Sequence, residues 1–450
     1  MARALRAAGV PGVGLLESGR DLDGLGRWSI LCARPRAVAV AEQGRALRLM
    51  RGPAGLPRRW PGDPLQAADE LLRRLRPARP APRGEAPFAG GALLLLSYDL
   101  GRRWERLPRA GSPGDARAPD LWLAVHDGAL LFDHARGRVQ LGGRPGIGLD
   151  EARAALAEAG REAPLEPPPA PTGRPPCSLD GPAYRAAVAT ARRLIRRGDL
   201  FEVNLSRRWE LPALDPAACA AALSTLAPAP FMADLELDAG RRLLSASPER
   251  FLCLDGSGRV SSWPIKGTRP RGATAAEDAR LVAELLASEK EAAELAMIVD
   301  LVRNDLGRVA RPGSVRVRDA RRLQSWPAVH HTVGVVEAEL EPGRGWADLV
   351  RAAFPPGSVT GAPKVRAMEV IDALEPVRRG AYCGAFGHVG WDGSMDLAVA
   401  IRILWLESAR ALLHAGGAVL LDSTPAAEER ETRHKALPLL RAAAASVRGR

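Results

Sequence analysis

The segment 162–176 (EAPLEPPPAPTGRPP) constrains the fold more than any other stretch of the chain. Seven of its residues are proline, and its apolar residues follow neither a helical nor a strand period. Proline fixes φ and has no backbone N–H, so this segment is expected to be an extended linker or crossing strand. It predicts a chain divided into a smaller N-terminal region (1–161), a linker (162–177) and a larger catalytic region (178–445).

The hydrophobic pattern on either side of this segment predicts both strands and helices. In the N-terminal region, short apolar runs at 92–96 and 129–132 predict strands, and 64–76 has helical spacing. In the C-terminal region, helices are expected at 180–197, 275–303 and 362–374, and strands at 200–210, 243–260, 383–391, 396–406 and 411–421. The first of these helices should begin after Asp180, an N-cap residue, and end before Gly198. Because neither G-x-G-x-x-G nor a P-loop is present, the pattern favours an α+β fold over a doubly wound nucleotide-binding sheet.

Composition excludes several classes of protein. The net charge is +12, but the basic residues are dispersed and aromatic residues are only 4% of the chain, which disfavours nucleic-acid binding. No apolar run approaches the roughly 20 residues that span a bilayer, so we expect no membrane association and a cytoplasmic location. The cysteines include no C-x-x-C pair and predict neither a zinc site nor a disulfide framework; they are Cys32, Cys177, Cys219, Cys253 and Cys383.

Lysine is scarce, and its positions are therefore informative. Only four of the 64 basic residues are lysines, and one of them, Lys266, lies in PIKGTRPRG (264–272) between two prolines and beside Gly267. Glycine at such a turn lets a ligand approach the backbone closely. A lysine amine becomes a nucleophile when desolvation or a neighbouring cation lowers its pKa, and Arg269 is such a cation. Lys266 is the candidate nucleophile, with an ordinary surface lysine as the alternative.

Two pairs of glutamates have the spacing of one helix face. Glu291 and Glu294 lie within 288–305, and Glu428 and Glu431 follow DSTP (422–425), which marks a helix start. Two such helices can supply carboxylates to one hard divalent cation from opposite sides, and Mg²⁺ favours oxygen ligands of this kind. The alternative for either pair alone is an exposed acidic face.

Three further segments carry candidate residues. Glu249, in SASPERF (245–251) at the end of an apolar strand, could be a partly buried general acid. The loop FPPGSVTGAPK (354–364) runs into a helix and could bind a carboxylate with its backbone N–H groups, with charge added by Lys364. Arg402 ends the strand DLAVAIR (396–402) and could clamp a carboxylate with its guanidinium.

Taken together and in this order, these blocks resemble the chorismate-utilising enzyme family, which includes anthranilate, aminodeoxychorismate, isochorismate and salicylate synthases. The resemblance runs from LLES (15–18) to ETRHK (431–435) and is densest in the C-terminal region, with GDLFEVNLSRRW, SPERF, PIKGTRPRG, GSVTGAPK, YCGAFG and DSTP. It implies antiparallel sheets packed as a sandwich with helices outside. The stretch PFAGGALLLLSYDLGRRWERLP (87–108) is most similar to the aminodeoxychorismate and anthranilate synthase branch.

Within that branch the resemblance assigns roles residue by residue. It implies Lys266 as the nucleophile that attacks C2 of chorismate, Glu249 as the general acid for the departing C4 hydroxyl, and ammonia as the group that enters at C4. It implies a Mg²⁺ ion near Glu291, Glu294, Glu428 and Glu431. It implies substrate contacts from Thr268, His331, Thr360, Gly361, Arg402, Gly416, Gly417 and Lys435. A separate glutamine amidotransferase subunit is the expected ammonia source, and whether tryptophan binds at Glu17 and Ser18 is left open.

Lys266 is the discriminating position, because anthranilate synthases resemble PIAGT where this chain has PIKGT. The predicted reaction is therefore the formation of 4-amino-4-deoxychorismate for para-aminobenzoate and folate synthesis. Anthranilate synthesis is the first alternative, isochorismate or salicylate synthesis the second, and a catalytically inactive paralogue a third. The chain departs from the family pattern at Leu295, where His is usual, at Glu202, where Gln is usual, and at Ala418, where Gly is common.

Overall fold

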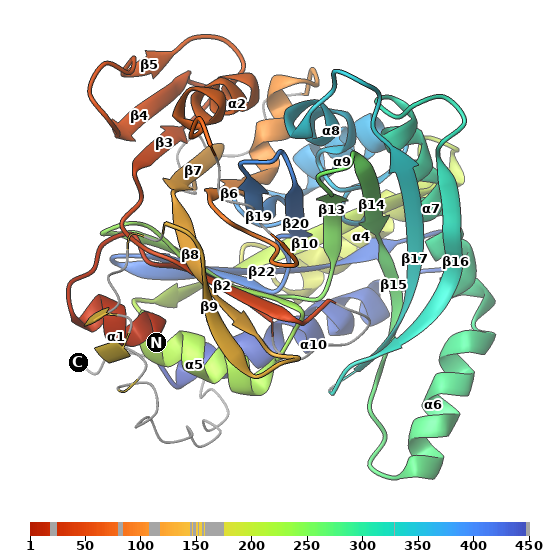
Figure 1. The fold of residues 1–450 in the computed structure, drawn as a ribbon. Helices are drawn as coiled ribbons and strands as arrows, with labels where there is room; N and C mark the ends of the chain where they lie inside the picture. The colour runs from red at the N-terminus through yellow and green to blue at the C-terminus, as the bar shows by residue number, and fades with distance from the viewer. Residues whose placement is uncertain are drawn as a thin grey trace.

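Two large antiparallel sheets form the centre of the molecule in a computed structural model, and helices cover their outer faces (Figure 1). The structure describes residues 1–18, 25–79, 84–107, 118–144, 146, 150–151, 153–154, 157, 175–327 and 329–446. Most of the expected linker, 162–174, lies outside the described residues. The expected α+β class with antiparallel sheets and outer helices is confirmed.

The first sheet has ten strands, and each pairs with its neighbours in antiparallel register. In spatial order they are β18 (Gly361–Ala362), β10 (Glu202–Pro212), β22 (Arg410–Val419), β21 (Ile403–Glu407), β12 (Arg241–Ser247), β11 (Phe231–Asp238), β1 (Gly14–Glu17), β2 (Trp28–Cys32), β8 (Gly128–Asp133) and β9 (Arg138–Gly143). Strands from before and after the proline-rich segment thus share this sheet.

The second sheet has twelve strands and is also antiparallel throughout. Its order is β15 (Ile265–Pro270), β17 (Val329–Glu339), β14 (Arg259–Trp263), β13 (Arg250–Leu254), β20 (Met395–Val399), β19 (Ala385–Gly390), β6 (Gly91–Leu96), β7 (Leu121–His126), β3 (Ala37–Ala41), β4 (Leu47–Arg51) and β5 (Arg59–Trp60), with β16 (Arg316–Ser325) paired to β17. This sheet, too, combines both regions.

The helices pack on the outer faces of the sheets. The chain forms α1 (Ala2–Ala7), α2 (Pro64–Leu75), α4 (Gly181–Arg196), α5 (Pro216–Leu226), α6 (Ala275–Ala287), α7 (Glu289–Gly307), α8 (Trp346–Ala353), α9 (Lys364–Leu374) and α10 (Pro425–Ala444), with short 3₁₀ turns at Tyr98–Arg103 and Gly357–Val359. Helix α10 packs on β22 between α4 and α5, and α7 packs on β15, β16 and β17. Among the described residues, no helix combines the length and apolar character needed to cross a membrane.

The expected helix starts are built by side-chain caps. Asp180 accepts a hydrogen bond from the Ala183 N–H at 2.8 Å at the start of α4, as predicted. The single long helix expected over 275–303 is instead two helices, α6 and α7, that meet at Ser288. Ser288 adopts an extended backbone conformation, and its hydroxyl accepts a hydrogen bond from the Glu291 N–H at 3.3 Å. A capping serine between two apolar patterns therefore ends one helix and begins the next.

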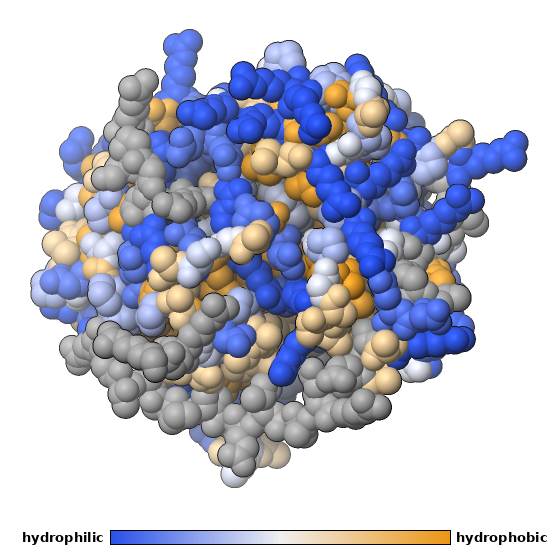
Figure 2. Space-filling view, turned by 90° about the vertical axis from the view of Figure 1, so that its left-hand side faces the viewer, coloured by the Kyte–Doolittle hydropathy of each residue, from blue (hydrophilic) through white to orange (hydrophobic). Residues whose placement is uncertain are grey.

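The main hydrophobic core lies around the central strands of the second sheet. Every residue of β6 and of β7 is buried, which explains why GALLLL and LWLAVH are continuous apolar runs rather than alternating ones. By contrast, the face of the molecule in Figure 2 is dominated by hydrophilic residues with small apolar patches between them. The main core includes buried residues from strands of both sheets and so packs one sheet against the other. The candidate site lies where the chain passes between them.

Candidate active site

Two chain crossings between the sheets lie side by side and carry two of the candidate residues. The chain leaves the first sheet after β12 and enters the second at β13, and Glu249 lies in this connection. It returns from β20 to β21 through Arg402. The two crossings are tied together by backbone hydrogen bonds, because the Val399 N–H donates to Glu249 O and the Ala246 N–H donates to Arg402 O, each at 3.0 Å. The junction of the sheets thus places Glu249 and Arg402 on neighbouring segments.

Lys266 lies on β15 next to an irregularity in the strand. The register of β15 against β17 shifts between Lys266 and Thr268, and Gly267 between them has a φ of +77°. A Cβ added at Gly267 would come within 2.9 Å of Leu285 and 3.3 Å of the Glu291 carboxyl carbon. Glycine is therefore required for the backbone conformation and for the close approach of α6 and α7.

The amine of Lys266 is buried between two carboxylates. Its Nζ lies 2.7 Å from Glu202 Oε1 and 2.7 Å from Glu294 Oε1, and 7% of the residue is exposed. Burial alone would lower the pKa of this amine, but the charges and hydrogen bonds of Glu202 and Glu294 outweigh burial and raise it. The expectation that Arg269 lowers the pKa of Lys266 is wrong, because Arg269 pairs with Glu284 and Glu291 instead. As placed, the side chain is an ammonium.

Glu249 is a buried carboxyl close to this ammonium. It is 5% exposed, and burial raises its pKa to about 7, although a hydrogen bond from Ser358 and the charge of Lys266 act in the opposite direction. Glu249 and Ser358 also line a small pocket, together with Phe251 and Asp305. A carboxyl with this pKa is present in both protonation states near neutral pH, as a general acid and base requires.

The raised pKa of Glu249 predicts a pH-dependent effect on stability. The folded protein binds this proton more tightly than the unfolded chain, so stability falls as pH rises from about 4.5, the ordinary value, through about 7. Glu249→Gln removes this loss, and its stability relative to wild type should therefore grow by roughly 2–3 kcal/mol between pH 5 and pH 8. Urea unfolding of both proteins at the two pH values measures this difference. A stability difference that does not change with pH would contradict the raised pKa.

The two predicted acidic pairs face the same region from two helices. On α7, Glu294 contacts Lys266 and Glu291 lies 2.9 Å from Arg269 Nη1. On α10, Glu431 lies 2.7 Å from Lys435 Nζ, and Glu428 is buried. Burial, followed by the charge of Glu431, raises the pKa of Glu428. The structure therefore brings both pairs to the surroundings of Lys266, whose charge also acts on Glu431.

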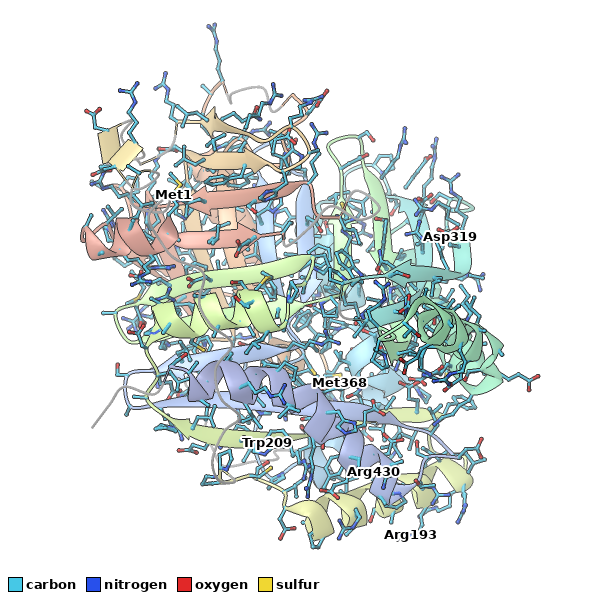
Figure 3. The ribbon with its side chains drawn as sticks, turned by 90° about the horizontal axis from the view of Figure 1, so that it is seen from below. Met1, Arg193, Trp209, Asp319, Met368 and Arg430 are labelled. Atoms are coloured by element: carbon cyan, nitrogen blue, oxygen red, sulfur yellow. The ribbon has the colours of Figure 1, made fainter. Side chains whose placement is uncertain are left out.

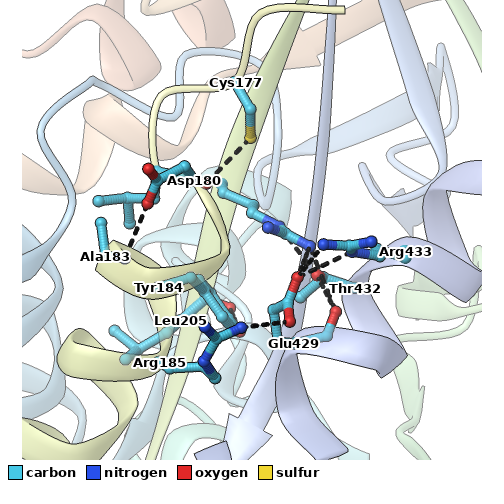
Figure 4. A network of polar contacts seen from close by, with 11 residues as sticks. Cys177, Asp180, Ala183, Tyr184, Arg185, Leu205, Glu429, Thr432 and Arg433 are labelled. Atoms are coloured by element: carbon cyan, nitrogen blue, oxygen red, sulfur yellow. Dashed lines mark hydrogen bonds and ion pairs between the residues drawn. The ribbon is translucent and has the colours of Figure 1, made fainter. Parts of the chain in front are cut away.

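A polar network that is buried at Arg207, Glu429 and Thr432 fixes α10 where it carries these glutamates (Figure 4). Glu429 accepts a hydrogen bond from Arg185 of α4 at 2.9 Å and forms an ion pair with Arg433 at 2.6 Å. Arg207 of β10 donates to the Thr432 hydroxyl at 2.9 Å. Seen from below, the part of α10 around Arg430 lies between α4 and the pair α6 and α7 (Figure 3). This anchoring holds the face of α10 that bears Glu428 and Glu431 toward α7.

The donor atoms at this place suit a magnesium ion in their chemistry. Oε2 of Glu291 and Oε2 of Glu428 are buried and have no hydrogen-bond partner among the described residues. Gly417 lies close to the carboxylates of α10. A Cβ added at Gly417 would be 3.0 Å from Glu428 Oε2 and 3.3 Å from Glu431 Oε1. As placed, however, no three His, Cys, Asp or Glu side chains of the described chain converge on one point. Metal binding would therefore require carboxylates to leave their present cations, Lys266, Arg269 and Lys435.

Arg402 and His331 lie near each other on the other side of the candidate site. Arg402 has a φ of +51°, and its side chain has no anionic partner among the described residues, while burial lowers its pKa. His331 Nδ1 lies 2.9 Å from the Thr268 hydroxyl, and its Nε2 is buried with no partner in the described chain. Burial, followed by the charge of Arg402, lowers the pKa of His331 to about 3. His331 is therefore neutral, and Arg402 is a cation with no counter-charge among the residues that the structure describes.

The other predicted substrate-binding residues border this region along β10. Gly361 pairs with Val203 and has a φ of +136°, and the Thr360 hydroxyl donates to Pro356 O at 3.0 Å. Gly416 of β22 pairs with Ser206 of β10. Gly416 O accepts a hydrogen bond from Lys435 at 3.1 Å.

Lys364, predicted to add charge for an anion, is already engaged elsewhere. Its Nζ donates to Asp305 and to Ala353 O, both at 2.6 Å. In this arrangement it links α9 to α7 and α8.

Glu17 and Ser18, named for tryptophan, lie away from Lys266 at the end of β1. The Ser18 hydroxyl donates to Pro230 O at 3.1 Å, and the Ser18 N–H donates to the Ser29 hydroxyl at 3.1 Å. Burial, followed by the charge of Asp234, raises the pKa of Glu17. These residues form part of a separate polar region between β1 and β11.

The structure also identifies a functional candidate that the sequence pattern did not assign to the site. Glu202 was noted only as a departure from the family pattern, yet it is fully buried and contacts Lys266 directly. A charged residue at the start of the apolar strand EVNL was the available signal. The other two departures lie elsewhere: Leu295 is wholly buried in the core, and Ala418 pairs with Asn204 in the first sheet.

Comparisons with known proteins identify the family to which the chain is similar. A family model described as chorismate binding enzyme matches residues 23–441. The aminodeoxychorismate synthase component 1 of Klebsiella aerogenes is 41% identical over 93% of this chain and 90% of the relative. The anthranilate synthase component 1 of Streptomyces coelicolor is also 41% identical, over 85% of this chain and 77% of the relative. The crystal structure of anthranilate synthase component I from Streptococcus pneumoniae superposes with a TM-score of 0.77 at 30% identity, covering 94% and 93% of the two chains. Relatives named for two different reactions are thus equally similar.

Proposed function

Because the chain belongs to the chorismate binding enzyme family, we propose that it acts as an aminodeoxychorismate synthase component 1. It would convert chorismate and ammonia to 4-amino-4-deoxychorismate and water. The observation that carries this proposal is the buried amine of Lys266, which contacts Glu294 and whose charge acts on both Glu431 and Glu249.

In the proposed reaction, Lys266 and Glu249 divide one displacement into two. The Lys266 ammonium first loses one proton to solvent, and the neutral amine then forms a bond to C2 of chorismate while the ring double bonds shift and the C4–O bond breaks. Glu249 gives its proton to the departing hydroxyl, which leaves as water. Ammonia then bonds to C4, the bond from C2 to Lys266 breaks, and the Glu249 carboxylate takes the proton released by the entering nitrogen. Covalent catalysis of this kind replaces one difficult step with two easier ones.

The remaining residues would bind and neutralise the substrate. Arg402 is suited to a carboxylate of chorismate, because it is a partly buried guanidinium that lacks a counter-charge in the described chain. A magnesium ion held by Glu291, Glu294, Glu428 and Glu431 would neutralise a substrate carboxylate and part of the negative charge that now raises the pKa of Lys266. Thr268 and His331 would contact the ring from β15 and β17, with Thr360, Gly361, Gly416, Gly417 and Lys435 around them.

Anthranilate synthesis is the second candidate, and the equal identity of relatives with that name favours it. Both candidate reactions begin with loss of the C4 hydroxyl, and they differ in where the nitrogen enters. Lys266 would form a bond to C2, the carbon at which anthranilate synthesis adds its nitrogen. The presence of this amine therefore supports entry of ammonia at C4. We therefore place aminodeoxychorismate synthesis first.

Product identity tests this choice directly. With chorismate, Mg²⁺ and ammonium, the purified chain should release 4-amino-4-deoxychorismate, and chelation of the metal should stop the reaction until Mg²⁺ is restored. Glutamine should replace ammonium only when an amidotransferase subunit is added. Separation of the products by liquid chromatography and mass spectrometry distinguishes this product from anthranilate and isochorismate. Release of anthranilate as the main product would overturn the proposal.

A further inference from the structure

Glu202 contacts Lys266 from a rigid part of the first sheet. It is the first residue of β10 and pairs with Ala362 of β18, while the next residue, Val203, pairs with both Gly361 and Val419. Its side chain is 0% exposed, and Oε1 accepts a hydrogen bond from Lys266 Nζ at 2.7 Å. Its Oε2 has no partner among the described residues. The carboxylate is thus fixed by strands on both sides and makes one hydrogen bond, to the candidate nucleophile.

The two carboxylates that hold Lys266 differ in their surroundings. Glu202 belongs to a sheet and is completely enclosed, whereas Glu294 belongs to helix α7 and is 11% exposed. Glu294 also stands one helical turn from Glu291, which has an unpartnered oxygen. Glu294 is therefore the contact that a bound cation would compete for, and Glu202 is the contact that would remain.

We propose that Glu202 is a positioning residue for Lys266, an inference that rests on the proposed function. An ammonium has three N–H bonds, and two of them are directed to Glu202 and Glu294. The third bond position of the nitrogen therefore points away from both carboxylates. The hydrogen bonds to Glu202 of β10 and to Glu294 of α7 thus set the direction of this third position. Glu202 is the more rigidly held of the two acceptors.

Substitutions that keep or remove the acceptor test this role. Glu202→Gln keeps an oxygen that can accept from Lys266, whereas Glu202→Leu has a similar size and no acceptor. Glu210→Leu is the matched control, because Glu210 lies on the same strand and pairs with Arg410 at 3.1 Å, away from Lys266. For each variant we would measure the thermal midpoint, chorismate affinity, kcat, and the rate at which chorismate adds to the peptide containing Lys266 in the absence of ammonia.

Loss of the fixed acceptor should act on the reaction rate rather than on binding. In Glu202→Leu, kcat and the rate of adduct formation should fall by about 10- to 100-fold, as expected for loss of a hydrogen bond to a charged group, with chorismate affinity within about twofold of wild type. Glu202→Gln should recover most of this rate, and Glu210→Leu should match wild type.

The outcomes separate this inference from the proposed function. A folded Glu202→Leu protein that forms the adduct at the wild-type rate or faster would overturn the positioning role, as would a Gln variant as slow as the Leu variant. A lower thermal midpoint with unchanged rates would show a purely structural role and would overturn it as well. Failure of wild type to form any adduct or any 4-amino-4-deoxychorismate would instead overturn the proposed function itself.

Discussion

Replacement of Lys266 by alanine is expected to lower the rate of 4-amino-4-deoxychorismate formation by about 1000-fold or more, since it removes the nucleophile from a covalent route. The fold should persist with a lower stability, because the buried carboxylate of Glu202 loses its cation. Glu202 and Glu294 would lose their shared partner, and the pKa of Glu202, which the charge of Lys266 now lowers, should rise further. Steady-state kinetics with ammonium as the nitrogen source gives the rate, and circular dichroism checks the fold.

Lys266→Arg is the matched control for charge. Arginine keeps a cation beside both carboxylates, but its guanidinium stays protonated and cannot attack chorismate. The arginine variant should therefore be as inactive as the alanine variant. If arginine restored most of the activity, Lys266 would be an electrostatic contact only. A shift of the alanine variant toward anthranilate would agree with the PIAGT pattern of the sister enzymes.

Arg402→Gln is expected to raise the chorismate concentration needed for half-saturation by about 100-fold, because a buried charge pair with a substrate carboxylate is lost. The same change should stabilise the substrate-free protein by about 1 kcal/mol or more, since the guanidinium is partly buried without an anionic partner in the described chain. Kinetics and urea unfolding measure the two effects, which have opposite signs.

The opposite signs distinguish a ligand-binding arginine from a structural one. Arg410→Gln is the control, because Arg410 forms ion pairs with Glu407 at 3.0 Å and with Glu210 at 3.1 Å. It should leave chorismate affinity unchanged and should not gain stability. If Arg402→Gln lost stability and kept its affinity, Arg402 would serve the fold rather than the substrate.

Local patterns predicted several structural features correctly, because these features depend on short-range spacing. The i,i+3 pairs on α7 and α10 do lie on helix faces that turn toward Lys266, and Asp180 does cap α4. The apolar run at 92–96 predicted a strand, and it forms β6, which lies inside the second sheet with all its residues buried. In each case, the residues that determine the outcome lie within one or two helical turns or one strand of each other.

Contacts between distant segments could not be predicted in the same way. Glu202 contacts Lys266 only because β10 and β15, which belong to different sheets, approach each other. No local sequence pattern indicates that approach. The contacts of Lys266 with Glu202 and Glu294 raise its pKa and so reverse the expected direction of the shift. The break at Ser288 was missed because the apolar pattern continues across it, while a single hydroxyl cap decides the boundary.

The mass of the peptide that contains Lys266, measured after wild-type protein is mixed with chorismate without ammonia, tests the central claim most directly. The proposed reaction predicts a mass increase equal to chorismate minus one water, located on Lys266 by fragmentation and discharged as 4-amino-4-deoxychorismate when ammonium is added. The Lys266→Ala protein should show no such peptide. Full turnover by wild type with no adduct at any time after rapid mixing, or an adduct on a different residue, would contradict the assignment of Lys266 as the nucleophile.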